Sequence, residues 1–494
     1  MVNGPLRSGA SPATSLGAIA LNRFGLGARP DDRPGADPQR SLLDQFARYD
    51  PAPAALMALP DAGQMVQAYQ SEQRALQQMS PPAPPSAMAP AASDAAVTPA
   101  SPLRTPEQQA ARKDFTQEVR ALYRQAVQAR MASALTTDAP FVERLVHFWS
   151  NHFCISADNP QLTAFAGAFE RDAIRPHVLG RFEDMLFAVE QHPAMLVYLN
   201  QAQSVGPNSQ AAQRAAQTGK VRGLNENLAR EIMELHTLGV RSGYSQADVT
   251  EFARALTGWS VDGLGARGTR PEADPVGFVF RPQTHEPGDR TILGKRYGQA
   301  GAEQAHAVMT DLAHAPATAR HVATKLARHF AGDSPPPALV DRLAHSFQRS
   351  RGDLKGLYAT LIASPEAWVP QPVKFKTPWE WSTSALRALG LTDLARLPIE
   401  AAQQQLGQPV WKPGSPAGWD DTAPSWAAPD ALLRRVELAQ RLAGIAGRSL
   451  DARILASQVL PGTLSAATAE QIAFAESSTV ALALLLVSPE FLRR

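Results

Sequence analysis

The sequence contains a single cysteine, Cys154, among its 494 residues. An intrachain disulfide is therefore excluded, and folding does not depend on an oxidising compartment. Long apolar runs are also missing, since no segment approaches the roughly 20 uninterrupted apolar residues that a membrane helix requires. The amino terminus likewise lacks the sustained apolar stretch of a signal peptide, so the chain as written is expected to be cytoplasmic.

Charge of one sign is not in excess, because the formal net charge is +2 and charged residues make up only 19% of the chain. This balance gives no sign of nucleic acid or of a strongly acidic partner. The sequence also lacks a glycine-rich phosphate loop, a Gly-x-Ser-x-Gly nucleophile elbow and a Cys-x-x-Cys pair. Nucleotide hydrolysis, simple α/β-hydrolase chemistry and structural zinc are therefore disfavoured.

Strand signals are sparse, and apolar residues mostly recur at helical spacing, as Val119, Leu122 and Val127 do. This periodicity predicts a mainly α-helical fold with one large multi-helical domain. The exception is the alternation of apolar residues from Val276 to Phe280, which precedes a turn-forming Glu-Pro-Gly-Asp. We therefore expect one small β-hairpin at about residues 276–297.

Two stretches of biased composition interrupt the helical pattern. Residues 80–106 are rich in Pro, Ala and Ser, which predicts a disordered insert between an N-terminal helical part (1–79) and the main helical domain (107–494). Residues 201–223 are polar and rich in Gln, Ala and Gly. They predict a flexible loop, which would be a natural lid if the segment that follows it is a site.

That following segment, "NENLAREIMELHTLG", combines an apolar helical stripe with three acids and a histidine. The stripe predicts a helix that ends at Gly239 in a left-handed cap. Asn227, Glu231 and Glu234 share the opposite face, so two carboxylates can converge on one ligand, proton or divalent metal. His236 is not expected to join them, because it lies roughly 200° from Glu234 around a regular helix.

The next predicted helix begins at a capping box formed by Ser245 and Asp248 and would bring Glu251 into the same acidic neighbourhood. Gathered carboxylates raise one another's pKa, which suits a general acid or base. Glu231 and Glu234 are thus candidate catalytic residues, with Asn227 and Glu251 as binding residues. The ordinary alternative is a solvated helix face with surface ion pairs and a packed His236.

Histidines offer two further candidates. His147 and His152 are candidate metal ligands, although their i, i+5 spacing is not that of two ligands on one helix, and they can equally be packed in an aromatic-rich core helix. His285 and Asp289 flank a turn, close enough for a hydrogen bond that would either position a catalytic base or simply hold the turn. The remaining histidines, such as His329, are expected to be structural or exposed, and Cys154 a buried apolar residue.

The loop at residues 408–428 gathers three tryptophans, Trp411, Trp419 and Trp426, among Pro and Gly. Large flat side chains on a rigid loop suit stacking on a sugar or a partner protein, so the three are candidate binding residues. Alternatively, they attach the loop to the helical body.

Eight blocks along the chain, including "LNRFGLGARP", "FWSNHF", "NENLAREIMELHTLGV", "KLARHF" and "LGQPVWKPGSPAGWDDTAPSW", together resemble the bacterial family DUF1800, a domain of unknown function. The resemblance spans nearly the whole chain except for the two stretches of biased composition. It implies no activity that can be carried over to a residue. It does imply frequent export and a partner encoded nearby, a sulfatase-like or phosphatase-like hydrolase.

Two functions follow from these patterns. One is a metal-assisted or acid/base enzyme that acts on a polymeric or envelope substrate. The other is a non-catalytic accessory protein that uses the tryptophan-rich loop to contact its hydrolase partner. An enzyme requires the acids and histidines to converge in one concave pocket, whereas an accessory protein requires an exposed aromatic patch.

Overall fold

A computed structural model describes residues 16–33, 35–79, 105–219, 223–262, 277–372, 374–447 and 450–494 of the chain. The described residues are mainly helical, as predicted, and their strands form two small antiparallel sheets. No helix in this described part is long and apolar enough to cross a membrane. The insert predicted at 80–106 lies almost wholly outside the described residues, which resume at Thr105, the N-cap of α6.

The helices of the first half of the chain are α1 (Leu16–Ile19), η1 (Ala20–Phe24), α2 (Pro38–Leu43), α3 (Gln45–Arg48), α4 (Ala54–Met57), α5 (Ala62–Gln78), α6 (Pro106–Thr136), α7 (Pro140–His152), α8 (Pro160–Phe169), η2 (Glu170–Ile174), η3 (Arg175–His177), α9 (Phe182–Glu190), α10 (Pro193–Tyr198), η4 (Gln201–Gln203), α11 (Gln210–Gln217), α12 (Asn227–Glu231), η5 (Ile232–His236) and α13 (Gln246–Leu256). Those of the second half are η6 (Pro282–Thr284), α14 (Ala302–His314), α15 (Pro316–Ala331), α16 (Pro337–Arg349), α17 (Leu354–Ala363), η7 (Pro365–Trp368), α18 (Pro378–Ala388), α19 (Ile399–Gln405), α20 (Ala423–Trp426), α21 (Pro429–Ala446), α22 (Ala452–Val459), α23 (Ala466–Ala473) and α24 (Ser478–Leu486).

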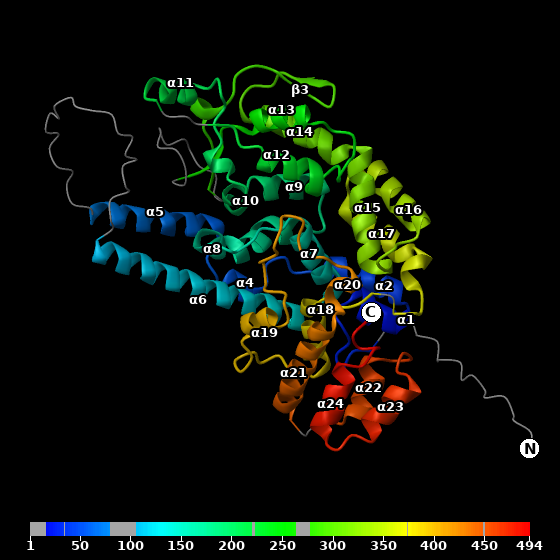
Figure 1. Ribbon diagram of the computed structural model, residues 1–494. Helices are drawn as coiled ribbons and strands as arrows, with labels where there is room; N and C mark the ends of the chain where they lie inside the picture. Colours follow the sequence, from blue (N-terminus) through cyan, green and yellow to red (C-terminus); the bar gives the residue numbers. More distant parts are fainter. Residues whose placement is uncertain are drawn as a thin grey trace, which may run out of the picture.

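Helix α7 lies near the centre of this arrangement (Figure 1). It starts with Pro140, which suits a first helical turn because the missing N–H would have no partner there. Nearly all of its residues are buried, including Phe141 and Trp149 at 0% exposure. Helices α5 and α6 pack side by side and extend to one side of α7, α15 to α17 pack on the other, and α21 to α24 form a separate bundle (Figure 1). Several helices therefore share α7 as a common support.

A β-hairpin lies within the predicted range 276–297, but its strands are not the ones that the sequence pattern indicated. Strand β2 (Phe278–Phe280) pairs with the distant β1 (Trp259–Val261), and β3 (Arg290–Ile292) pairs with β4 (Lys295–Tyr297). The tight turn of the second pair is Leu293-Gly294, where both residues have positive φ, as a two-residue hairpin turn requires. The Glu-Pro-Gly-Asp turn therefore connects two sheets, and Val276 lies outside the described residues.

The segment 201–223 also differs from the expected loop. Its described residues include the short η4 and the helix α11, whose N-cap Ser209 accepts a hydrogen bond from the backbone N–H of Ala212 at 3.2 Å. Its Ala and Gln residues, taken above as loop-forming, are good helix formers. The capping box of Ser245 and Asp248 at the start of α13, by contrast, is confirmed.

A buried network of ion pairs joins α6, α7, η2 and η3. On α7, Glu143 accepts from the Arg175 guanidinium, with one N–O distance of 2.9 Å. Arg175 also lies 3.5 Å from Glu170, which in turn accepts from Arg130 at 2.8 Å. Burial alone would raise the pKa of Glu143, but Arg175 and His147 hold it below its ordinary value. Because these side chains are buried away from water, the opposite charges stabilise one another instead.

Substitution of Arg175 by Met should therefore destabilise the fold strongly. The Glu143 carboxylate would remain buried without its main counter-charge, and losing one partner of a buried pair typically costs about 3–5 kcal/mol. The matched control is Arg342→Met, which removes a surface pair with Glu366 and should cost no more than about 1 kcal/mol. Urea denaturation of the two variants measures the difference, and similar losses would contradict a structural role for the network.

Candidate functional site

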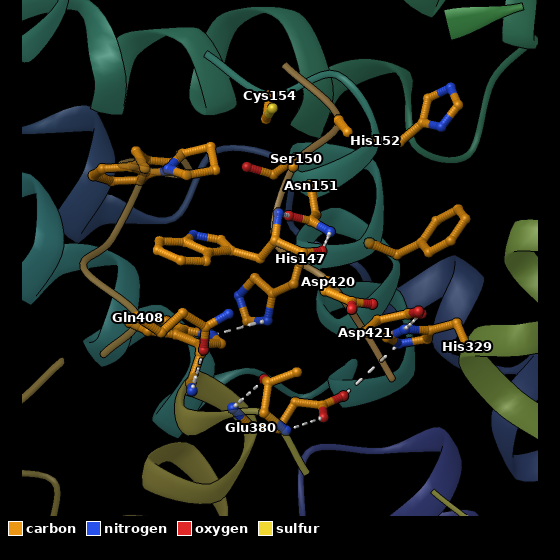
Figure 2. A pocket seen from close by; sticks show the side chains of 18 of the residues that line it. His147, Ser150, Asn151, His152, Cys154, His329, Glu380, Gln408, Asp420 and Asp421 are labelled. Atoms are coloured by element: carbon orange, nitrogen blue, oxygen red, sulfur yellow. Dashed lines mark hydrogen bonds and ion pairs between the residues drawn. The ribbon is translucent and has the colours of Figure 1, made fainter. Parts of the chain in front are cut away.

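Helices α7, α15 and α18 and the loop between α19 and α20 surround a cavity of about 450 Å³. The part of this loop that borders the cavity is called here the cavity loop (residues 408–421). Figure 2 shows His147, Asn151 and His152 on the α7 side, with His329 and Asp421 lying together and Glu380 below them. Charged and aromatic side chains thus converge on one concave space, which makes it the candidate site.

His147 projects from α7 between an indole and a carboxylate. Its Nδ1 accepts a hydrogen bond from Trp379 Nε1 at 3.2 Å, and its Nε2 lies 3.6 Å from Glu143 Oε1. Because an indole N–H can only donate, the proton of the neutral imidazole is placed on Nε2, facing Glu143. Burial, and secondarily the charge of Arg130, lowers the pKa of His147. The buried ion network thus reaches the cavity through this side chain.

The cavity loop is fastened to α7 by Asn151. The side-chain amide donates to Trp419 O at 2.8 Å, and its oxygen accepts from Trp419 N at 2.8 Å. The adjacent Gly418 has φ +84°, and a Cβ there would collide with the backbone oxygen of Asn151. Only glycine therefore permits this approach of loop and helix.

Helix α15 supplies two of the cations that line the cavity. Lys325 and Arg328 are spaced i, i+3, so they are neighbours on one face of the helix, and both line the cavity. Neither has a hydrogen-bond or ion-pair partner within the described part of the chain, and Arg328 Nε is buried without one. The other two arginines that line the cavity, Arg130 and Arg144, each bind a glutamate.

Burial lowers the pKa of Lys325 to about 8, and the charge of Arg328 contributes to the lowering, whereas Cys154 and Asp421 oppose it. A lysine amine in water titrates near pH 10.4. Lys325 therefore exists partly as the free amine close to neutral pH, which is the form that accepts a proton or attacks an electrophile.

His329 occupies the next turn of α15, between two carboxylates. Its Nδ1 lies 3.9 Å from Asp421 Oδ2, and its Nε2 lies 3.9 Å from Glu380 Oε1. Burial and the charge of Arg494 lower the pKa of His329 to about 4. Burial would raise the pKa of Asp421, but His329 and Lys374 bring it to about 2. At neutral pH the pair is thus a neutral imidazole beside an ionised carboxylate, which suits proton transfer.

Aromatic side chains form the opposite wall. Trp379 and Trp411 both pack on the Arg130 guanidinium, whose carbon lies 4.4 Å and 5.3 Å from the two ring centroids. Trp411 Nε1 donates to Glu170 at 3.1 Å, and Trp419 is half-buried at the edge of the cavity. Trp426 lies outside the cavity, is 7% exposed, and donates to Asp420 O at 2.6 Å.

His152 and Cys154 close the far end of the cavity. His152 Nε2 lies 3.1 Å from His236 O, whereas its buried Nδ1 has no partner in the described residues. Cys154 donates to Pro416 O at 3.1 Å, and burial raises its pKa to about 12. As expected, Cys154 is a buried apolar residue, and its thiol helps to hold the cavity loop.

The acids of the segment 225–239 lie outside this cavity, and their helix is not regular. After Glu231 the α-helix changes to the π-helical turn η5, which invalidates the 100° spacing used to place His236. Burial raises the pKa of Glu231, and the charge of His236 partly opposes this. His236 itself is buried, with its Nδ1 2.7 Å from Glu190 Oε1. Packing of His236 was the ordinary alternative, and it is what the structure shows.

The predicted acidic neighbourhood forms only in part, because the charge of Glu234 contributes to raising the pKa of Glu231, whereas Glu251 is paired elsewhere. Glu251 binds Arg254 and lies 3.3 Å from Arg290, and Asn227 is exposed. Glu234 instead accepts from the phenol of Tyr244, whose pKa is raised by burial and by this carboxylate. The charges are thus dispersed over separate partners.

The predicted contact between His285 and Asp289 is also replaced by other partners. His285 Nδ1 lies 2.8 Å from Thr257 O, so this ring nitrogen is bound to the backbone. Asp289 is exposed and accepts from Arg296 Nε at 2.6 Å across the β3–β4 hairpin. His285 is thus bound to the C-terminal end of α13, and Asp289 is bound to β4.

Of the predicted site residues, the structure brings His147, His152, Trp411 and Trp419 together. In the described ranges, no group of three or more His, Cys, Asp or Glu side chains is placed to hold a metal ion, so His147 and His152 lack the further donors that a metal site needs. The residues missed above are Lys325, Arg328, His329, Glu380 and Asp421. The Lys-x-x-Arg-His spacing in "KLARHF" was a usable signal, because it places all three side chains on one helical face.

Comparison with known proteins gives one match. The model of a family described as "Protein of unknown function (DUF1800)" covers residues 19–493. No curated protein and no solved structure matches the chain significantly.

The state of Lys325 can be measured by competitive acetylation over a range of pH, followed by peptide mass spectrometry. We expect its reactivity to reach half-maximum near pH 8, far below the pH of about 10.4 expected for a lysine peptide added to the same sample. In an Arg328→Met variant the midpoint should move to higher pH, because removal of a neighbouring positive charge favours the protonated amine. A midpoint at the value of the reference peptide would contradict the assignment.

Proposed function

We propose that this chain, which belongs to the DUF1800 family of proteins of unknown function, is an enzyme that binds an anionic organic substrate in the central cavity and acts on it by acid/base chemistry. One observation carries the proposal. Two cations of the cavity, Lys325 and Arg328, have no ion-pair or hydrogen-bond partner among the described residues, whereas Arg130 and Arg144 are each paired with a glutamate.

A partly buried charge without a close partner is unfavourable unless a bound ligand supplies the opposite charge. Arg328 offers a planar fork of N–H donors, which matches a carboxylate, a phosphate or a sulfate. Trp379, Trp411 and Trp419 also line this cavity and give it an aromatic surface. Together they suit an anion attached to a ring or a sugar, because the ring can pack on the indoles while the anion meets the guanidinium.

Proton transfer would fall to the groups nearest the cations. Lys325 has a pKa of about 8, close to the pH at which a general acid or base works best. His329 is a neutral imidazole beside the ionised Asp421 and lines the same cavity, so it is a second candidate to carry a proton. The sequence predicted either a metal-assisted or an acid/base enzyme. We therefore retain the acid/base enzyme, although its residues differ from those that the sequence patterns indicated.

The polymeric or envelope character of the substrate stays a prediction, as does a hydrolase partner. The accessory-protein alternative required an exposed aromatic patch on the tryptophan-rich loop. Trp411 and Trp426 are each only 7% exposed, and their indole N–H groups are bound to Glu170 and Asp420. This burial favours the cavity over the outer surface of the loop as the place of function.

Calorimetric titration with D-glucuronate, glucose 6-phosphate, inorganic phosphate and neutral glucose tests the proposal. We expect the anionic sugars to bind more tightly than glucose and phosphate. Arg328→Met should weaken that binding at least about tenfold, since a hydrogen bond to a charged group contributes roughly 1.5–3 kcal/mol.

The matched control is Arg320→Met on the same helix, which removes an exposed arginine paired with Asp341. This variant should leave the affinity unchanged. Equal affinities for charged and neutral sugars, or equal losses in the two arginine variants, would overturn the proposal.

A further inference from the structure

We infer that Lys325 is a nucleophilic lysine that forms an imine with the carbonyl carbon of an anionic aldehyde or ketone, whose anionic group is held by Arg328. The inference rests on the proposed function and narrows its substrate class. It assigns different tasks to the two unpaired cations of α15, one as a permanent charge and the other as a reactive amine.

The geometry of α15 supports this division. Residues spaced i, i+3 on a helix have Cβ atoms roughly 5–6 Å apart, so their side chains reach one small molecule together. Both Lys325 and Arg328 line the cavity, and neither is held by another group of the described residues. A ligand with its carbonyl a few bonds from its anion, such as a 2-oxo acid or an oxidised sugar acid, matches this spacing.

The surroundings of Lys325 favour the free amine. A permanent cation, Arg328, lies on the same face of α15, and His321 and His152 lie near enough that the lysine charge lowers the pKa of each. The opposing charge is Asp421, which is already shared with Lys374 at 3.6 Å. Desolvation and a neighbouring cation are the two usual means of activating a lysine for imine formation. The pKa of about 8 is consistent with both.

The reaction is balanced without an oxidant. The lone pair of Lys325 Nζ attacks the carbonyl carbon, a C–N bond forms, and the carbonyl oxygen takes up a proton to give a carbinolamine. One N–H proton leaves the nitrogen as the oxygen is protonated; the C–O bond then breaks, the hydroxyl group leaves with the second N–H proton as water, and a C=N bond remains. His329 lines the same cavity one turn along α15 and is suited to carry these protons, because its imidazole is neutral at neutral pH.

The test uses the full chain, glyoxylate as the smallest anionic aldehyde, and sodium cyanoborohydride, which donates hydride to an imine and fixes it as a stable amine. With glyoxylate limiting at neutral pH, peptide mass mapping should find the carboxymethyl group on Lys325. Its occupancy should exceed that of the exposed Lys355 at least about tenfold, because the pKa of Lys325 is lowered to about 8 and Arg328 holds the carboxylate of glyoxylate beside the amine. Lys325→Arg should abolish this label, and Arg328→Met should reduce it.

Lys325→Arg removes the reactive amine, so imine trapping should be lost, while anion binding is followed by calorimetry on the unmodified chain. Mapping on the unmodified chain needs no variant and is therefore independent of folding. If anions bind but Lys325 is labelled no more than Lys355, the imine inference is overturned and the anion site stands. If neither anion binding nor selective labelling occurs, both proposals are overturned.

Discussion

The ion pairs among Glu143, Arg175, Glu170 and Arg130 hold the parts of this structure in place. They connect α6, α7 and the short helices η2 and η3, and Trp411 of the cavity loop donates to the same Glu170 carboxylate. Such a network is stabilising only when each charge keeps its partner, because a single unpaired member in a dry interior is costly. The position of one cavity wall is thus tied to the pairing of charges beneath it. Folding and site geometry depend on the same contacts.

Two kinds of buried charge can therefore be distinguished in one small region. The structural arginines are neutralised within the chain, and a glutamate lies beside each of them. Lys325 and Arg328 differ because they line the cavity without a close ion-pair partner. Their positive electrostatic potential therefore extends into the cavity. A low-dielectric surround strengthens this field, so a small number of cations is sufficient to select for an anion.

The sequence predicted the helical class, the helix around residues 227–236 and the capping box at Ser245 because these features depend on local spacing. It misplaced the strand pairs, since Phe278 pairs with Val261, which lies earlier in the chain than the range predicted for the hairpin. The acids of the segment 225–239 were overvalued, because a π-helical turn changes which side chains share a face. The cavity itself joins α7, α15, α18 and residues 408–421, and no local pattern predicts that these four segments meet.

Trp411, in the aromatic wall of the cavity, bears on how the cavity recognises a ligand. Its φ of 52° lies in the left-handed region, which costs a residue with a side chain roughly 1 kcal/mol or more. The conformation persists because its carbonyl oxygen accepts from Ala157 N at 2.8 Å and its indole is bound on the side away from the solvent. A receptor whose wall is fixed in this way is organised before its guest arrives, so little ordering entropy is lost on binding. A rigid cavity then excludes molecules of the wrong shape because its wall cannot move to accommodate them. It needs no closing movement around the right ligand.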